Sequence, residues 1–157
     1  GSVVAWGNPQ GGGDSTALRS QLAVGVYRIF ATKWAFAALK ADGSVCTWGR
    51  GIQVDERQRR EANCGADSSA VKKQLTSDVQ MLYSTDTAFA AVKTGGGVVT
   101  WGSPHGGGDS SLVRQQLKND VLVIYSTSAA FAAVKSGGNV VTWGDDDCGG
   151  DSTAVRT

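Results

Sequence analysis

The sequence repeats itself, and this repeat is the feature that most constrains the fold. Three full units and a fraction cover the chain, at residues 1–42, 43–95, 96–137 and 138–157. The first and third units share 22 of 42 residues without a gap. A unit this short cannot bury a core of its own, so neighbouring units must stack against one another. One tryptophan and one aspartate recur at equivalent positions in every unit: Trp6, Trp48, Trp101 and Trp143, and Asp14, Asp67, Asp109 and Asp151.

Each unit predicts three short strands and one short helix. The β-branched run VVTW at 98–101 is typical of a strand, and so is the alternating run at 121–125. The repeated Asp-Ser pair predicts a helix N-cap, followed by apolar residues spaced four apart. The alanine-rich run AFAAVK at 130–135 predicts a strand in a crowded place, joined to the next unit by a glycine turn. We therefore expect one mainly β repeat domain over 1–157.

The part of the unit that runs from strand through turn to Trp-Gly resembles the repeat of the RCC1-like (regulator of chromosome condensation) β-propellers. The resemblance rests on AFAALKADGSVCTWG, AFAAVKTGGGVVTWG and AFAAVKSGGNVVTWG. It implies propeller blades, each with three short strands and one short helix. A propeller of this family has about seven blades, so these short variant repeats make only part of a ring. Either the chain is a fragment of a longer array, or another subunit covers its open ends.

Composition excludes several classes of partner and location. Fifteen basic and fourteen acidic residues give a net charge of +1, so we expect no nucleic acid partner. No apolar run approaches the roughly 20 residues of a membrane span, and no leader peptide is visible. We therefore expect a soluble chain. Cys46, Cys64 and Cys148 form no Cys-x-x-Cys pair, which favours a reducing compartment: cytoplasm, nucleus or an organelle interior.

The sequence indicates no catalytic, metal or cofactor site. A catalytic group would need Asp109, Ser110 and His105, the single histidine of the chain. Because the aspartate recurs in every unit, a structural role at a helix start explains it better than catalysis. The glycine-rich loops lack the Gly-Lys-Ser/Thr of a phosphate-binding loop, and the cysteine spacing does not fit zinc.

Residues that break the repeat are the candidate interface. Trp34 stands where the other units have Thr87 and Ala129, and Arg28 replaces apolar residues. Trp and Arg are typical of interface hot spots, although local repacking at the end of the array also explains them. The second unit carries an 11-residue insertion, within RGIQVDERQRREAN at 50–63. This is either a binding loop or a solvated loop without a partner, and its candidate contact residues are Arg57, Arg59 and Arg60.

The function predicted from these observations is a non-enzymatic interaction scaffold, or an accessory subunit of a larger complex, built from RCC1-like repeats. The expected partners are proteins, including a large multisubunit assembly. The alternative is a regulatory module that resembles a small-GTPase exchange factor or the RCC1-like domain of a ubiquitin ligase.

Overall fold

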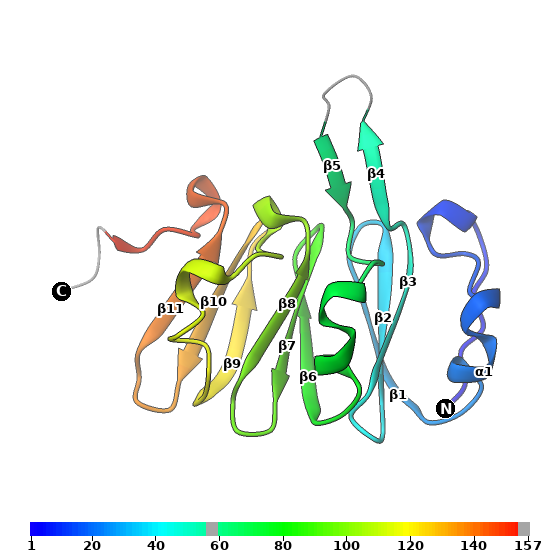
Figure 1. Cartoon of the computed structure of the whole chain (residues 1–157), viewed down its shortest axis with the longest axis horizontal. Helices are drawn as coiled ribbons and strands as arrows, with labels where there is room; N and C mark the ends of the chain where they lie inside the picture. Colours follow the sequence, from blue (N-terminus) through cyan, green and yellow to red (C-terminus); the bar gives the residue numbers. More distant parts are fainter. Residues whose placement is uncertain (56–59, 154–157) are drawn as a thin grey trace.

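A computed structural model describes residues 1–55 and 60–153 of the chain. Within these residues, nine strands form three antiparallel sheets, which we call blades 1, 2 and 3. They lie side by side in chain order, with the N-terminal segment beyond blade 1 (Figure 1). Blade 1 contains β1 (Val26–Ala31), β2 (Ala35–Lys40) and β3 (Val45–Gly49); blade 2 contains β6 (Val79–Ser84), β7 (Ala88–Lys93) and β8 (Val98–Gly102); blade 3 contains β9 (Val121–Ser126), β10 (Ala130–Lys135) and β11 (Val140–Gly144). The predicted mainly β repeat fold is confirmed.

The recurring tryptophan fixes each blade to the glycine-rich loop that precedes it. In blade 2, Phe89 of β7 lies opposite Trp101 of β8, and their rings stack with centroids 5.3 Å apart. The indole N–H of Trp101 donates to the carbonyl oxygen of Gly65 at 3.0 Å. Blades 1 and 3 repeat both contacts, with centroid distances of 5.3 and 5.2 Å and indole bonds of 3.0 Å to Gly12 and Gly107. Trp48, Trp101 and Trp143 are therefore buried.

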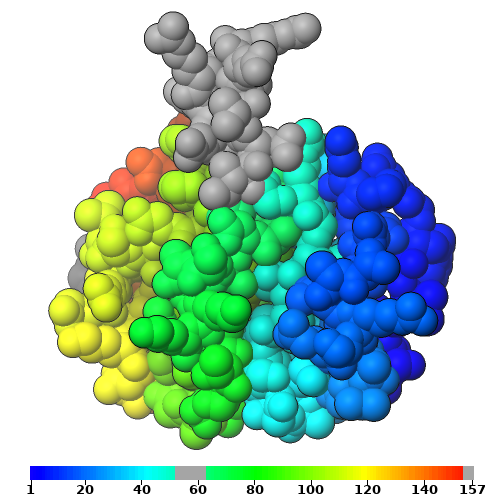
Figure 2. Space-filling model, turned by 45° about the vertical axis from the view of Figure 1, so that its right-hand side comes forward, coloured from blue at the N-terminus to red at the C-terminus, as the bar shows by residue number. Residues whose placement is uncertain are grey.

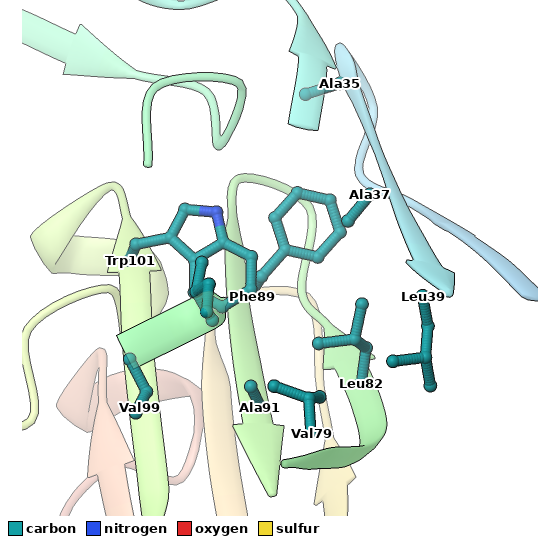
Figure 3. Packing of buried hydrophobic residues seen from close by; sticks show 10 residues of the cluster. Ala35, Ala37, Leu39, Val79, Leu82, Phe89, Ala91, Val99 and Trp101 are labelled. Atoms are coloured by element: carbon teal, nitrogen blue, oxygen red, sulfur yellow. The ribbon is translucent and has the colours of Figure 1, made fainter. Parts of the chain in front are cut away.

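The core lies between neighbouring blades, because each sheet alone is too small to bury one. The middle strand β2 turns Ala35, Ala37 and Leu39 toward blade 2, where they meet Leu82 and Phe89 (Figure 3). Small alanine side chains let the two sheets approach closely enough for the larger residues to fill the space. The equivalent face of blade 2 packs against blade 3 in the same way.

Hydrogen bonds also join neighbouring blades through their first strands and the loops that follow. The Ser84 hydroxyl donates to the Ala31 carbonyl, and the Ser126 hydroxyl donates to the Ser84 carbonyl, both at 2.8 Å. The Lys33 amide donates to Asp86 O, and the Asp86 amide donates to Ser128 O. In the part of the chain that the structure describes, these bonds connect each blade with the next one and not with the one beyond.

The predicted helices form, mostly as short 3₁₀ turns: η2 (Thr16–Leu18) with α1 (Arg19–Leu22), η3 (Ser69–Leu75) and η5 (Ser111–Val113). Further turns lie in the glycine-rich loops: η1 (Pro9–Gly11), η4 (Pro104–Gly106) and η6 (Asp146–Cys148). The repeated aspartate acts one residue earlier than an N-cap. Asp109 Oδ1 accepts the Ser111 amide at 2.8 Å in an Asx turn, and the N-cap Ser110 makes no side-chain capping bond. The same turn forms at Asp14, Asp67 and Asp151.

The structure differs from the repeat pattern in two places. The pattern predicts a strand with a core tryptophan over Val3 to Trp6, but this segment is not a strand and Trp6 is 83% exposed. The reason is that no middle strand lies beside it in the described structure. The described part of the insertion contains two strands where a loop was expected: β4 (Ile52–Asp55) and β5 (Arg60–Asn63) pair as an antiparallel ladder that projects beyond the blades (Figure 1).

Candidate functional site

The loop between β1 and β2 presents Trp34 to the surface. The Thr32 hydroxyl oxygen accepts the amides of Ala35 at 3.0 Å and Trp34 at 3.2 Å, and the hydroxyl donates to the Cys64 carbonyl at 3.0 Å. These bonds fix the loop backbone against the next glycine-rich loop. The Trp34 side chain remains 42% exposed, whereas the tryptophans on β3, β8 and β11 are buried.

Arg50 is the main contact of Trp34. Its guanidinium carbon lies 5.1 Å from the centroid of the Trp34 ring, within the range of a cation–π contact. The Arg50 amide also donates to the Trp34 carbonyl at 2.8 Å. Arg50 starts the insertion, two residues before β4, so the pair lies at the base of the projecting hairpin. Sequence reasoning did not select Arg50, although Ser103 and Asp145 at the equivalent positions show that it breaks the repeat.

Lys33 extends this surface toward blade 2. Its ammonium group lies 2.6 Å from a carboxylate oxygen of Asp86, and its amide donates to the Asp86 carbonyl at 2.9 Å. The two side chains are 62% and 37% exposed, so the ion pair contributes at most about 1 kcal/mol. Trp34 and Lys33, which are exposed, and Arg50 and Asp86, which are partly buried, thus form one group, which we call the Trp34 surface.

Arg28 belongs to a different surface. It lies in the middle of β1, where its guanidinium carbon is 5.3 Å from the centroid of the Tyr27 ring. Its Nη1 donates to the sulfur of Met81 on β6 at 3.8 Å. Among the described residues, no contact joins Arg28 to Trp34, so the structure does not bring the two predicted hot-spot residues together.

The basic residues of the insertion are only partly located. Arg60 is the first residue of β5 and lies opposite Asp55 in the ladder. Arg57 and Arg59 lie outside the described residues. The insertion that carries Arg60 begins at Arg50, whose guanidinium group lies against the Trp34 ring.

The residues of the catalytic alternative have structural partners instead. Asp109 accepts the Ser111 amide, and the Ser110 hydroxyl lies 2.9 Å from the hydroxyl of Thr100. His105 lies exposed in η4. Within residues 1–55 and 60–153, no hydrogen bond joins His105 to Ser110, and no cluster of three or more potential metal ligands is present.

The buried thiols are not activated. Burial raises the pKa of the Cys46 thiol, an effect that Lys40 opposes and Asp42 reinforces. Burial likewise raises the pKa of the Cys64 thiol, opposed by the charge of Arg50. The thiolate form is therefore disfavoured at both positions, as in structural cysteines.

Comparisons with known proteins support the fold. No family profile matches the chain, and no curated protein sequence matches it either. Among solved structures, it is similar to yeast RCC1 (Prp20) in complex with Kap60, at a TM-score of 0.52 and 19% identity over 76% of this chain. It is equally similar to Prp20p from Saccharomyces cerevisiae, at a TM-score of 0.52 and 20% identity over 76% of this chain. The chain covers only 29% and 30% of the Prp20 chain in those two structures.

These likenesses define the class of fold. The chain has an RCC1-like repeat fold and forms part of a propeller. In the described residues, no helix has the length and apolar character needed to cross a membrane.

Proposed function

We propose that this chain is a non-catalytic protein-interaction scaffold whose specific contacts come from the residues that break its repeat. The observation that supports this proposal is the half-exposed Trp34, held beside Arg50 at the base of the β4–β5 hairpin. The repeated residues are already used in stacking, turns and blade contacts. The side chains of the unit-specific residues take no part in these repeated contacts, so their exposed faces are available to a partner.

The chemistry of this surface fits a protein partner with an apolar pocket and carboxylate groups. A tryptophan ring provides a large rigid apolar contact, and arginine binds carboxylates through two parallel hydrogen bonds. Residues 50–63 contain four arginines against three acidic residues. We include Arg57, Arg59 and Arg60 of the insertion in the proposed contact, and Arg28 as a second contact on β1.

The two yeast structures are consistent with a role in protein binding. In one of them RCC1 (Prp20) is bound to Kap60, and the other is of Prp20p, which has binding properties to Gsp1p and histones. We propose that this chain likewise binds proteins through a rigid repeat scaffold, on its own unit-specific surface.

The test is quantitative binding to a protein that co-purifies with the chain. Once that partner is identified, Trp34→Ala should weaken Kd by roughly 30-fold or more, equivalent to about 2 kcal/mol. The triple change Arg57/Arg59/Arg60→Ala should mainly slow association and reduce its dependence on salt, because rim charges steer the encounter.

Matched controls separate binding from folding. Leu112→Ala removes a large exposed side chain from unit 3, and Arg114→Ala and Lys118→Ala remove exposed charges there. The controls should bind as the unaltered chain does. If Trp34→Ala and the triple variant also bind unchanged, while all variants keep the same Tm, the proposed surface is wrong.

A further inference from the structure

The segment Val3 to Gly7 occupies the position of a third blade strand without the rest of a blade. The Val3 amide donates to the Leu22 carbonyl at 2.9 Å, as the equivalent Val98 amide donates to Leu117. The Gly1 carbonyl accepts the Val26 amide at 3.0 Å, as the equivalent carbonyl of Gly43 accepts Val79. The segment therefore lies where β3 and β8 lie in their own units, although it is not itself a strand.

In a complete blade, the third strand pairs with a middle strand of fixed sequence pattern. β3 pairs with β2 so that Phe36 lies opposite Trp48, and Leu39 lies opposite Val45. The pairing satisfies backbone groups and stacks phenylalanine on tryptophan. In the described structure no middle strand lies beside Val3 to Gly7. Its side chains show the consequence, since Trp6 is 83% and Val4 77% exposed.

Beside this segment lies an apolar groove of about 230 Å³, formed by Trp6, Gly12, Ile29, Phe36 and Trp48. Figure 2 shows the N-terminal segment, in blue, at one edge of the molecule. Ile29 is 42% exposed, whereas the equivalent Leu82 and Ile124 are 1% and 2% exposed. Those two are covered by the middle strand of the preceding blade.

The covering strand in blade 1 defines what fits this groove. Ala35, Ala37 and Leu39 face blade 2, while Phe36 and Ala38 face the other way, toward Trp48. A strand that completes the edge therefore needs small residues at its first and third positions, an aliphatic residue at its fifth, and phenylalanine at its second. The same pattern stands in β7 and β10.

We propose that the edge formed by Val3 to Gly7 and the adjoining groove bind a β-hairpin from another polypeptide segment, whose second strand reads Ala-Phe-Ala-Ala-Leu/Val-Lys. The hairpin adds two strands to the open edge, stacks its phenylalanine on Trp6 and covers Ile29 with its alanines. The chain already makes this contact twice between its own blades, and an open strand edge is a template for such addition. This inference concerns a different surface from Trp34 and does not depend on the proposed function.

The test uses a hairpin that the chain itself supplies. Residues 119–137 contain β9 and β10, and the glycine that follows them, Gly138, is equivalent to Gly1. A second copy of 119–137 joined directly before Gly1 keeps the natural spacing of the repeat without a linker. In a Trp34→Phe background, Trp6 is the main exposed indole, so its fluorescence reports on the edge.

The fused hairpin should shift tryptophan emission to shorter wavelength, reduce quenching by acrylamide, and raise Tm. A fusion in which the phenylalanine of the added segment is changed to alanine should lose most of the emission shift. The shift should also disappear with Trp6→Phe. Free synthetic peptide 119–137, added to the unfused chain, should give the same shift in a saturable way, and the peptide with Phe131→Ala should not.

The proposal is overturned if Trp6 remains as accessible to acrylamide in the fusion as in the unfused chain and the free peptide gives no saturable shift. It is also overturned if the unfused chain buries Trp6 by forming dimers as its concentration rises, because each middle strand of a second copy is already paired on both edges within its own blade, and the occupant would then be another surface of that copy. Sedimentation velocity on the unfused chain distinguishes this outcome.

Discussion

Alanine at Gly65 should destabilise the chain far more than alanine at Gly149, although both glycines have a φ of +99°. They occupy equivalent positions in two of the glycine-rich loops. A Cβ at Gly65 would lie 2.7 Å from Cε2 and 2.9 Å from Cδ2 of Phe89, whereas a Cβ at Gly149 would meet nothing within 4 Å. Both substitutions force a left-handed backbone, but only the first also pushes into the Phe89–Trp101 stack.

The two costs can be separated. A left-handed conformation costs an L-residue roughly 1–2 kcal/mol, and overpacking of a well-packed site adds about 1–3 kcal/mol. We therefore expect a loss of about 1–2 kcal/mol for Gly149→Ala and about 2–5 kcal/mol for Gly65→Ala. Phe89 cannot easily retreat, because it is fully buried and stacked on a tryptophan that is itself hydrogen-bonded to Gly65.

Urea unfolding followed by tryptophan fluorescence measures both variants, with the midpoint as readout and the slope as a check that the unfolded state is unchanged. Gly65→Ala should cost less in a Phe89→Leu background, where the smaller side chain leaves room for the new methyl group. Equal losses for Gly65→Ala and Gly149→Ala, or no coupling with Phe89→Leu, would refute the steric reasoning.

Three further outcomes follow from the same contacts. Trp101→Phe should lower the free energy of unfolding in urea by about 1–3 kcal/mol or more, because it leaves the Gly65 carbonyl without its hydrogen-bond donor. The same change at the exposed Trp6 should alter the free energy of unfolding by no more than about 0.5 kcal/mol. Similar losses for the two variants would contradict this prediction. Hydrogen bonds from the side chain of Ser69, and to a lesser extent from its amide, lower the pKa of Asp67. The ionised Asp67 therefore stabilises the fold above its unfolded pKa of about 3.9, and this stabilisation is lost as pH falls through the folded pKa. The Tm of Asp67→Asn should fall less steeply on acidification than that of the unaltered chain, and parallel curves of Tm against pH would contradict this prediction. Cys46 and Cys64 are buried and Cys148 is partly exposed, so Cys148 should react first with a thiol reagent under native conditions, whereas three equal native rates would show that the loops open freely.

Much of the fold was predictable because the same sequence pattern for strands and turns occurs in each repeat unit. The spacing of Trp48, Trp101 and Trp143 places the third strand of each blade, and the AFAAVK runs place the middle strands. Equivalent positions in other units identify which residues share a role. This reasoning fails at Trp6, which matches its counterparts in sequence but lacks, in the described structure, the neighbouring strand that would bury it.

Features outside the repeat were harder to predict. The β4–β5 ladder was hard to predict because only β4, with Ile52 and Val54, shows a short apolar–polar alternation, whereas its partner β5 is mostly charged and polar. The contact between Arg50 and Trp34 depends on a loop that brings residues from two strand ends together, which single-sequence patterns do not show. The Asx turn at Asp109 differs from an N-cap by one residue, and both use the same residue types.

The hydrogen bonds between blades connect each blade only with the next one in the chain, and this also determines how the chain responds to a pulling force. A blade peeled from one end takes with it only the contacts to the next blade, so rupture should proceed one blade at a time. The extension gained at each step is set by the repeat length: at most about 15 nm for a 42-residue unit, and at most about 19 nm for the 53-residue unit that carries the insertion. A force–extension trace would therefore register the insertion as one longer step among otherwise equal ones.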